Sequence, residues 1–340
     1  MDFAHKVSVI IPTNHGLVDL QSIVQAVCSQ TIKPAEIVII DSSTGTHDEC
    51  PSQIVRLCHF SSIHLLYFRI TLAFPGAARN IGIDKATAEF IAFIDVQTIP
   101  KPQWLEVSLN MLANHEFAGV WGATCFSAKT NFERLVRDGI YGASPQKTLP
   151  GSVFRREVFN KTGQFIEWVR AGEDTEWLLR LEVLKTPMTL SSASLVDYRG
   201  LIGLDLKKLL LKWHRNYIAS RELPHFFPQR LLLWLFMYPI IVLIAFNWNY
   251  LIADWRMDSP FYIGYVTRIA AILPLLLYFF IRGFVLPLKR GVDIDKLLPT
   301  RFLAIALVCF LADLVKITIF SLPKRRNLIS AIKKRLIFKN

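Results

Sequence analysis

The sequence has few charged residues for its length, and they are unevenly distributed. Charged side chains make up 19% of the 340 residues, hydrophobic side chains make up 52%, and the mean hydropathy is +0.34. A disordered chain has the opposite balance, so disorder is excluded as the main state. Residues 1–228 carry 23 Lys and Arg against 22 Asp and Glu, whereas residues 229–340 carry 16 against 5. A nearly neutral region followed by an apolar, basic one is typical of a membrane anchor and predicts no nucleic-acid partner.

Cysteine is scarce as well. The chain has five cysteines, an odd and scattered set in which no pair has the spacing of metal ligands. The first apolar run, residues 7–11, is too short for the hydrophobic segment of a signal peptide. We therefore expect a reduced, cytosolic environment for the N-terminal domain, with the thiols in its core.

Short β-branched runs alternate with helical patterns in the N-terminal part of the chain. This alternation predicts an α/β domain with a Rossmann-like, mostly parallel sheet covered by helices on both faces. Ligands bind such sheets outside the carboxyl ends of the strands, where Asp41 and Asp95 follow apolar runs. The expected strands lie at 7–11, 36–40, 64–69 and 90–94, and the expected helices lie at 17–30 and 75–86.

The character of the chain changes after residue 205. We expect a first domain at 1–205, an amphipathic membrane-interface segment at 206–228 and a transmembrane region at 229–340. That last region contains three apolar segments long enough to cross a bilayer as helices, at 231–253, 264–287 and 302–322, followed by a basic tail. The chain is therefore predicted to be a multi-pass membrane protein with a cytoplasmic first domain.

The number of crossings stays open between two and three. Basic residues in the loop 288–301 fit a cytoplasmic location after two crossings, but a third crossing places a tail with seven basic residues outside. The third segment also carries Asp313 and Lys316, which are spaced to pair on one helical face. We favour two spans with the third segment re-entrant or packed against them, and a third span is the alternative.

Six short motifs occur in an order that resembles family 2 glycosyltransferases. The resemblance covers about residues 7–180 and implies a GT-A fold, a nucleotide-sugar donor of the UDP or GDP type, a divalent metal and inversion at the anomeric carbon. The motifs are Val-Ser-Val-Ile-Ile-Pro-Thr at 7–13, Ile-Val-Ile-Ile-Asp-Ser-Ser at 37–43, Gly-Ala-Ala-Arg-Asn-Ile-Gly at 76–82, Phe-Ile-Asp-Val-Gln at 93–97, Pro-Gly-Ser-Val-Phe-Arg-Arg at 150–156 and Gly-Glu-Asp-Thr-Glu-Trp at 172–177.

The resemblance implies donor-binding roles for Pro12, Asp41, Arg79 and Asp95. An aspartate such as Asp41 can accept hydrogen bonds from a uracil-type base, although Asx turns also use aspartate before Ser42. An arginine near a helix N-terminus can contact the nucleotide, and a surface ion pair is the alternative for Arg79.

The motif at Asp95, Val96 and Gln97 departs from the family pattern, which usually has Asp-x-Asp. Mg²⁺ and Mn²⁺ prefer hard oxygen ligands, often one or two carboxylates with substrate phosphates. Gln97 supplies an amide oxygen in place of the second carboxylate. Either Asp95 and Gln97 hold a Mg²⁺ or Mn²⁺ ion with the diphosphate, or metal dependence is reduced, or activity is lost.

The resemblance places the catalytic base at Asp174, beside the acceptor hydroxyl. A general base of this kind contributes about 10²–10⁴-fold in rate. Gly151, Ser152 and Glu173 are predicted on the acceptor side. A helix-starting acidic cluster is the alternative for Asp174 and Glu173.

A basic stretch follows the first domain and admits two interpretations. Trp213, His214 and Arg215 loosely match an aromatic and basic loop that relatives often carry near the diphosphate. A helix on an anionic membrane surface explains Arg215, Lys207, Lys208 and Lys212 equally well.

Together these features predict a membrane-anchored, inverting glycosyltransferase of envelope polysaccharide or glycan biosynthesis. Its acceptor is expected to be a hydroxyl of a lipid-linked saccharide or glycolipid at the bilayer surface. One alternative is a synthase that transfers the sugar to polyprenyl phosphate itself. Another is an inactive, membrane-tethered protein that binds nucleotide sugars or acts as a scaffold.

Overall fold

The N-terminal domain is built on one mixed sheet. The computed structural model describes residues 6–321 except 15–16, 44–48, 114, 222, 224–228 and 253–255. The strands occur along the sheet in the order β3-β2-β1-β4-β7-β6-β9-β5, and β8 pairs with β6. They are β1 (Val7–Thr13), β2 (Glu36–Asp41), β3 (His64–Arg69), β4 (Phe90–Phe93), β5 (Thr98–Pro100), β6 (Gly119–Phe126), β7 (Gln146–Arg155), β8 (Met188–Leu190) and β9 (Val196–Tyr198).

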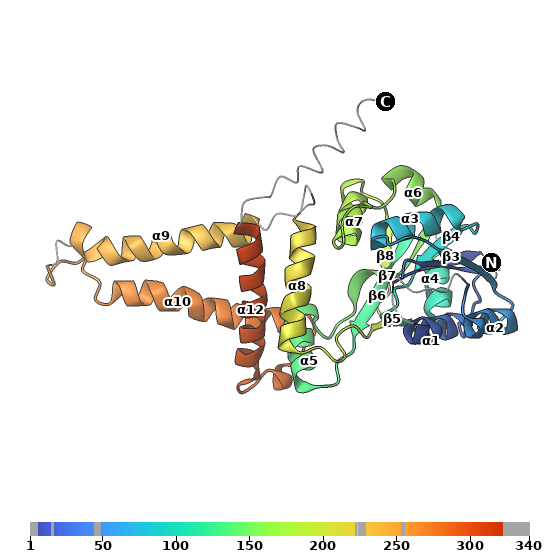
Figure 1. The fold of residues 1–340 in the computed structure, drawn as a ribbon. Helices are drawn as coiled ribbons and strands as arrows, with labels where there is room; N and C mark the ends of the chain where they lie inside the picture. The colour runs from blue at the N-terminus through green and yellow to red at the C-terminus, as the bar shows by residue number, and fades with distance from the viewer. Residues whose placement is uncertain are drawn as a thin grey trace, which may run out of the picture.

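Helices cover both faces of the sheet and then continue into a separate helical region (Figure 1). Those of the domain are α1 (Leu17–Cys28), α2 (Ser52–Phe60), α3 (Pro75–Lys85), α4 (Trp104–Leu112), α5 (Asn131–Val136), α6 (Glu157–Thr162) and α7 (Glu173–Val183). The later ones are α8 (Leu206–Ser220), α9 (Gln229–Leu251), α10 (Val266–Phe280), α11 (Leu286–Lys289) and α12 (Arg301–Ser321). Two π-helical turns, Arg137–Tyr141 and Ile281–Val285, extend α5 and join α10 to α11, and a 3₁₀ turn at Ile294–Lys296 precedes α12.

The four strands predicted in the N-terminal part are present, and so are the two predicted helices between them. β3, β2, β1 and β4 pair in parallel, with Thr13 of β1 opposite Asp41 of β2. The other half of the sheet is more mixed than expected, because β7 pairs antiparallel with both β4 and β6. The carboxyl ends of β1, β2 and β4 therefore lie side by side at the same end of the sheet, where the sequence predicts a ligand site.

Helix α3 is held tightly on the parallel half of the sheet. Pro75 occupies its first turn, where the missing N–H costs nothing. A Cβ on Gly82 would overlap the Ile10 side chain of β1, so glycine lets the helix approach the strand closely. The buried Asn80 amide donates to the Phe165 carbonyl, and its oxygen accepts from the Phe165 N–H. These contacts hold the body of α3 against β1 and the segment around Phe165.

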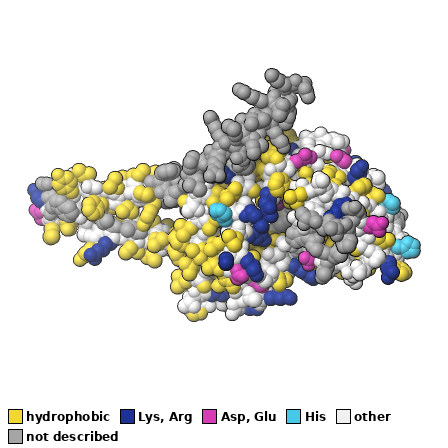
Figure 2. Space-filling view, viewed as in Figure 1, with side chains coloured by type: hydrophobic (Ala, Val, Ile, Leu, Met, Phe, Trp, Pro, Cys, Tyr) yellow, Lys and Arg dark blue, Asp and Glu magenta, His cyan; other side chains and the backbone are white. Residues whose placement is uncertain are grey.

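The C-terminal helices include a long antiparallel hairpin formed by α9 and α10, which projects away from the domain (Figure 1). Its surface is mostly apolar (Figure 2), and side chains such as Leu243, Ile272 and Leu276 are each more than half exposed. At the tip, the Trp248 ring N–H donates to the Phe261 carbonyl. Aromatic and apolar exposure of this extent is typical of lipid-facing helices.

Helix α12 runs across the base of this hairpin and beside α8 (Figure 1). Leu209 and Trp213 of α8 and Val308 and Ala312 of α12 share a buried cluster with Val136 of the domain. The Arg301 guanidinium at the start of α12 also pairs at 2.8 Å with the fully buried Asp138 carboxylate. Helix α12 is therefore packed against the N-terminal domain as well as against the hairpin.

The expected pairing of Asp313 with Lys316 does not occur. The Asp313 carboxylate pairs instead with Arg282 at 2.9 Å and accepts a hydrogen bond from the Tyr278 hydroxyl at 2.8 Å. The Lys316 ammonium lies over the ring of Tyr217, 5.8 Å from its centre. The packing of α12 against the base of α10 brings Arg282 to Asp313, and this contact replaces the local one.

Two stretches of the described residues are long and apolar enough to cross a membrane. They are Arg268–Lys289 and Arg301–Phe320, while Met237–Leu251 of α9 forms a shorter apolar helix. Helix α9 begins and ends two residues before the expected segment 231–253, and α12 begins and ends one residue before the expected segment 302–322. The expected segment 264–287 corresponds to α10, the π turn and α11, which together run from 266 to 289. The basic tail beyond residue 321 lies outside the described residues.

Candidate functional site

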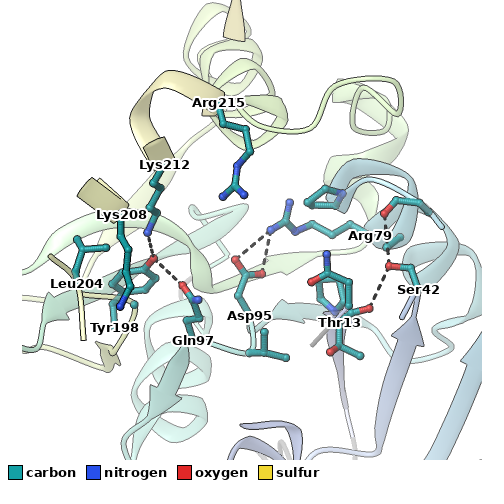
Figure 3. A pocket seen from close by; sticks show the side chains of 17 residues that line it. Thr13, Ser42, Arg79, Asp95, Gln97, Tyr198, Leu204, Lys208, Lys212 and Arg215 are labelled. Atoms are coloured by element: carbon teal, nitrogen blue, oxygen red, sulfur yellow. Dashed lines mark hydrogen bonds and ion pairs between the residues drawn. The ribbon is translucent and has the colours of Figure 1, made fainter. Parts of the chain in front are cut away.

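A cavity of about 460 Å³ opens at the carboxyl ends of the parallel strands (Figure 3). The strand ends contribute Pro12 and Thr13 from β1, Ser42 after β2, and Asp95 and Gln97 after β4. The start of α3 adds Pro75, Ala78 and Arg79. The opposite wall comes from later segments and consists of Tyr198, Gly200, Leu204, Lys208, Lys212 and Arg215. The cavity therefore brings together residues about 200 positions apart in sequence.

Arg79 bridges two of the predicted site carboxylates. Its Nη2 lies 2.9 Å from Asp95 Oδ1 and 3.2 Å from Oδ2, and its Nη1 lies 2.7 Å from Glu173 Oε1. The Arg79 and Glu173 side chains are almost fully buried, whereas the Asp95 side chain is 32% exposed and faces the cavity. A planar guanidinium suits this double contact because its donors form a rigid fork. The arginine thus joins α3, the end of β4 and the start of α7.

Glu173 has a raised pKa for a carboxyl group that contacts an arginine. Burial and the neighbouring Asp174 carboxylate raise the pKa of Glu173 to about 7, and Arg79 opposes this shift. Arg79 divides its positive charge between Asp95 and Glu173, and Glu173 Oε2 has no hydrogen-bond partner among the described residues. The cluster therefore contains a buried carboxyl group that can change protonation state near neutral pH.

Asp174 follows at the N-terminus of α7 and remains half-buried. Its Oδ1 accepts a hydrogen bond of 2.7 Å from the Thr175 N–H. Gly172 precedes the helix at φ +94, and a Cβ there would also meet Leu223 and Ser220 at the end of α8. The start of α7 is thus packed beside α8, near Arg79, although Asp174 and Glu173 are not among the residues that line the cavity.

Gln97 lines the cavity, and a chain of two hydrogen bonds connects its side chain to α8 (Figure 3). The Tyr198 hydroxyl donates to Gln97 Oε1 at 2.9 Å, and the Lys212 ammonium donates to the Tyr198 oxygen at 3.1 Å. Burial and the Asp95 carboxylate raise the pKa of Tyr198 to about 12, so the hydroxyl keeps its proton at neutral pH. A Cβ on Gly200 would overlap both Tyr198 Oη and Gln97 Oε1, so glycine at this position makes room for the contact.

Asp41 is buried at the last position of β2, close to but not lining the cavity. Its Oδ1 accepts from the Ser43 N–H at 2.8 Å, and its Oδ2 accepts from the Tyr67 hydroxyl at 2.7 Å. The neighbouring Ser42 does line the cavity. The first contact is the Asx turn named as the alternative for Asp41, and the loop 44–48 beyond it lies outside the described residues.

Gly151 and Ser152 lie inside the sheet, away from the cavity lining. The Ser152 hydroxyl donates to the Thr148 carbonyl at 2.6 Å and accepts from the Gly122 N–H. Gly151 has φ +87, and its carbonyl accepts from the Trp104 ring N–H. The contacts of both residues shape the bulge between β6 and β7, and their acceptor-side role stays a prediction.

The sequence left two interpretations of the basic stretch at 207–215, a loop near the diphosphate and a helix on a membrane surface. The stretch forms part of α8, and its basic residues do not all face the same way. Lys208, Lys212 and Arg215 line the cavity from one face of α8, at i, i+4 and i+7. Trp213 is buried against α12 on the opposite side, and Lys207 is exposed. Tyr198, Gly200 and Leu204 line the same wall and were missed, because nothing in their local sequence distinguishes them.

The oxygen atoms near Asp95 and Gln97 form a poor site for a divalent cation. Among the described residues, no three His, Cys, Asp or Glu side chains come together in a way that would hold a metal. Both Asp95 oxygens contact the Arg79 guanidinium, and Gln97 Oε1 accepts from Tyr198 in front of Lys212. A divalent ion between Asp95 and Gln97 would therefore lie between two positive side chains.

Comparisons with known proteins find glycosyltransferases. The model described as Glycosyl transferase family 2 matches residues 8–168. An uncharacterized glycosyltransferase of Rickettsia felis is 29% identical over 179 residues, which cover 50% of this chain and 29% of that protein. Glycosyltransferase AglE of Haloferax volcanii is 28% identical over 187 residues, which cover 51% of this chain and 60% of that protein. The chain thus spans less than two thirds of the length of these relatives.

The fold has a counterpart among solved structures. The mannosyltransferase PcManGT of Pyrobaculum calidifontis, solved in complex with GDP-Man and Mn²⁺, superimposes with a TM-score of 0.53 at 16% identity. The similarity covers 93% of this chain and 88% of that one, and it concerns the fold alone. Over residues 8–168 the N-terminal domain is therefore similar to glycosyl transferase family 2, and the chain has the GT-A fold that its motifs predicted.

Proposed function

We propose that this protein transfers a sugar from a nucleoside diphosphate sugar of the UDP or GDP type to a hydroxyl group at a membrane surface. The observation that carries the proposal is the cavity at the ends of β1, β2 and β4, with Arg79 and Asp95 on one wall and the basic face of α8 on the other. A nucleotide sugar needs a place for its base and ribose beside a place for its diphosphate. The wall formed by the strand ends suits the base and ribose, and the wall formed by α8 suits the diphosphate.

The donor is proposed to lie with its nucleoside near Pro12 and the end of β2. Ser42 and Thr13 line this part of the cavity, and Asp41 stands directly behind Ser42. Asp95 extends from the strand ends toward the middle of the cavity, where carboxylate oxygens can accept hydrogen bonds from ribose hydroxyls. Arg79 orients Asp95 and balances its charge.

The reaction is proposed to be a single displacement with inversion. The acceptor hydroxyl oxygen attacks the anomeric carbon while Asp174 takes its proton, and the bond from that carbon to the diphosphate oxygen breaks. The nucleoside diphosphate leaves with the bonding electrons. Asp174 is preferred as the base over Glu173, because Glu173 is buried against Arg79 whereas Asp174 is open to an incoming acceptor.

The membrane attachment is proposed to come from the α9 and α10 hairpin. α9 has 23 residues, so it is roughly 34 Å long at about 1.5 Å per residue, enough for a hydrocarbon core of about 30 Å. With the hairpin inserted along its length, α8 and α12 lie along the membrane surface, since they run across its base. The wall of the cavity formed by α8 then lies near lipid headgroups, where a lipid-linked saccharide or glycolipid can reach it.

This arrangement agrees with two crossings and with α12 as a packed, non-spanning helix. Both ends of the hairpin then face the side that holds the catalytic domain, which we propose to be the cytoplasm. The loop before α12 is basic and lies on the same side, as expected from the tendency of basic loops to stay in the cytoplasm.

Two alternative functions would use the same cavity. Transfer to polyprenyl phosphate needs no base, because a phosphate oxygen is already ionised, so it predicts activity without Asp174. An inactive binding protein is favoured by Gln97 in place of a carboxylate, and it predicts nucleotide binding without turnover.

The test uses the full-length protein in detergent with extracted membrane lipid and a panel of UDP- and GDP-sugars. We expect Asp174→Asn to lower the transfer rate by about 10²–10⁴-fold while nucleotide binding is retained. Glu176→Gln is the matched control, because Glu176 is on the same turn and pairs with Arg180. If Asp174→Asn still transfers sugar, Asp174 is not the base and a phosphate acceptor is favoured. If the parent protein binds nucleotide but transfers no sugar, the inactive binding protein is favoured.

A further inference from the structure

The strand-end wall and the α8 wall of the cavity differ in their free charge. On the strand-end wall, the Arg79 charge is offset by Asp95 and Glu173. On the α8 wall, Lys212 contacts the neutral Tyr198 hydroxyl, and Lys208 donates to the Gly203 carbonyl and pairs with the exposed Asp205 at 3.4 Å. Among the described residues no ion pair is found for Arg215, whose guanidinium points into the cavity. At Lys212 and Arg215 the α8 wall therefore carries positive charge that no carboxylate among the described residues neutralises.

This charge lies where a diphosphate needs it. Each phosphate of a nucleoside diphosphate sugar is ionised, and a further negative charge appears when the bond to the sugar breaks. Lys212 and Arg215 are one helical turn apart on α8, so their head groups can contact neighbouring phosphates. Lysine and arginine are the side chains that bind phosphate through charge-assisted hydrogen bonds.

The position that holds a second carboxylate in the family pattern is also linked to this wall. Gln97 has no charge to attract a cation, and its amide oxygen is joined through Tyr198 to Lys212. Gly200 leaves the space in which Tyr198 and Gln97 meet. The residues around Gln97 are thus arranged to hold an ammonium group beside the amide.

We propose that this chain binds the diphosphate of its donor without a divalent cation, and that Lys212 and Arg215 of α8 supply the positive charge in its place. The proposal rests on the proposed function, since it assigns the partner of the diphosphate within the same cavity. Asp95 keeps its contact with Arg79, and Gln97 positions Tyr198 and, through it, Lys212.

The test is calorimetric titration of the full-length protein in detergent with UDP, GDP, UMP and GMP, in EDTA and again with Mn²⁺. We expect the diphosphate of the preferred base to bind in EDTA within about threefold of its affinity in Mn²⁺. Lys212→Gln should weaken the diphosphate by about tenfold or more and change the monophosphate much less, because a charge-assisted hydrogen bond is lost. Lys207→Gln removes the same charge from an exposed position on α8 and should match the parent protein.

A second variant tests the role of Gln97. Gln97→Asp should make diphosphate binding more sensitive to Mn²⁺, since it restores the second carboxylate. Binding of UDP or GDP that is abolished by EDTA and restored by Mn²⁺ in the parent protein overturns the proposal, as does Lys212→Gln behaving like Lys207→Gln. In both cases the proposed function stands, whereas absence of binding by every nucleotide in both buffers overturns the proposed function with it.

Discussion

Arg79 is the residue at which three separate segments of the N-terminal domain meet. Its guanidinium is buried with Glu173 and reaches Asp95 at the cavity. Although burial opposes its charge, the Asp95 and Glu173 carboxylates hold the pKa of Arg79 above its ordinary value. Loss of one partner of such a buried cluster leaves another charge without compensation, which costs about 3–5 kcal/mol. The stability of the domain and the geometry of its site therefore depend on the same side chains.

Glu173 makes the stability of the protein depend on pH. Its pKa rises from 4.5 to about 7 on folding, so the folded state binds more protons than the unfolded state between these values. The stabilisation is present below about pH 4.5, declines as the pH rises toward 7 and is lost above it. Glu173→Gln should remove this part of the pH dependence. The measurement is the difference in melting temperature between the variant and the parent protein from pH 4.5 to 8.

The expected difference is a relative gain in stability of the variant as the pH rises from 4.5 to about 7, with no further gain above 7. Glu176→Gln serves as the control, because Glu176 pairs with Arg180 four residues along the same helix. Parallel melting curves for Glu173→Gln and the parent protein across this range would contradict the shift.

At the scale of single residues, the sequence predicted positions better than contacts. Asp95 is found at the cavity because it follows an apolar strand, and that relation is local. The partner of Gln97 is Tyr198, 101 residues later, and no local pattern links them. Arg79 was predicted to touch the nucleotide, and only the folded chain reveals that Glu173 and Asp95 compete for its donors.

Among the elements, α8 has two functional faces. One face presents Lys208, Lys212 and Arg215 to the cavity, and the other packs Leu209 and Trp213 against the domain and α12. The spacing of the basic residues predicts that they share one helical face. It does not predict what that face meets, since a membrane surface and a diphosphate both attract lysine and arginine. In the structure this face meets the cavity formed by Tyr198 and the strand ends, which are distant from it in sequence.

The loop between β9 and α8 sets the position of this helix over the cavity. Gly200→Ala would force a Cβ into Tyr198 Oη and Gln97 Oε1, and overpacking of this kind costs about 1–3 kcal/mol. We expect a lower melting temperature and weaker nucleotide binding in the same variant. Thermal unfolding and calorimetry measure the two effects.

Gly264→Ala is the matched control, since a Cβ there meets nothing within 4 Å. Adding Tyr198→Phe to Gly200→Ala should recover little of the lost stability, because the new Cβ still overlaps the Cζ atom of residue 198 and Gln97 Oε1. No change in either measurement for Gly200→Ala would show that the Tyr198 to Gln97 contact has no bearing on the site.

For the whole molecule, the main division is between the N-terminal α/β domain and the apolar hairpin. Periodicity and composition predicted an α/β fold followed by long apolar helices, because buried strands and apolar helices are each encoded in contiguous residues. The placement of α12 was not determined by composition. Its length and hydropathy are those of a spanning helix, yet Ile305 and Cys309 are fully buried between the hairpin base and the domain.

The hairpin should account for membrane attachment. Ile272→Arg with Leu276→Arg places two charges on exposed positions of α10, each at a cost of about 2.5–3.5 kcal/mol near the centre of a bilayer. We expect the double variant to leave the membrane fraction in flotation with lipid vesicles. Val183→Arg is the control, because Val183 is 72% exposed on α7 of the catalytic domain. Equal flotation of all three proteins would exclude α10 as the membrane-inserted element.

Helix α8 connects the cavity to the C-terminal hairpin through packing. Its apolar face shares a buried cluster with α12, and α12 in turn contacts α10 and α9. If the hairpin inserts in a bilayer as proposed, a change in its tilt would be transmitted through α12 to the cavity wall that carries Lys212 and Arg215. Nucleotide affinity would then depend on the thickness of the surrounding bilayer.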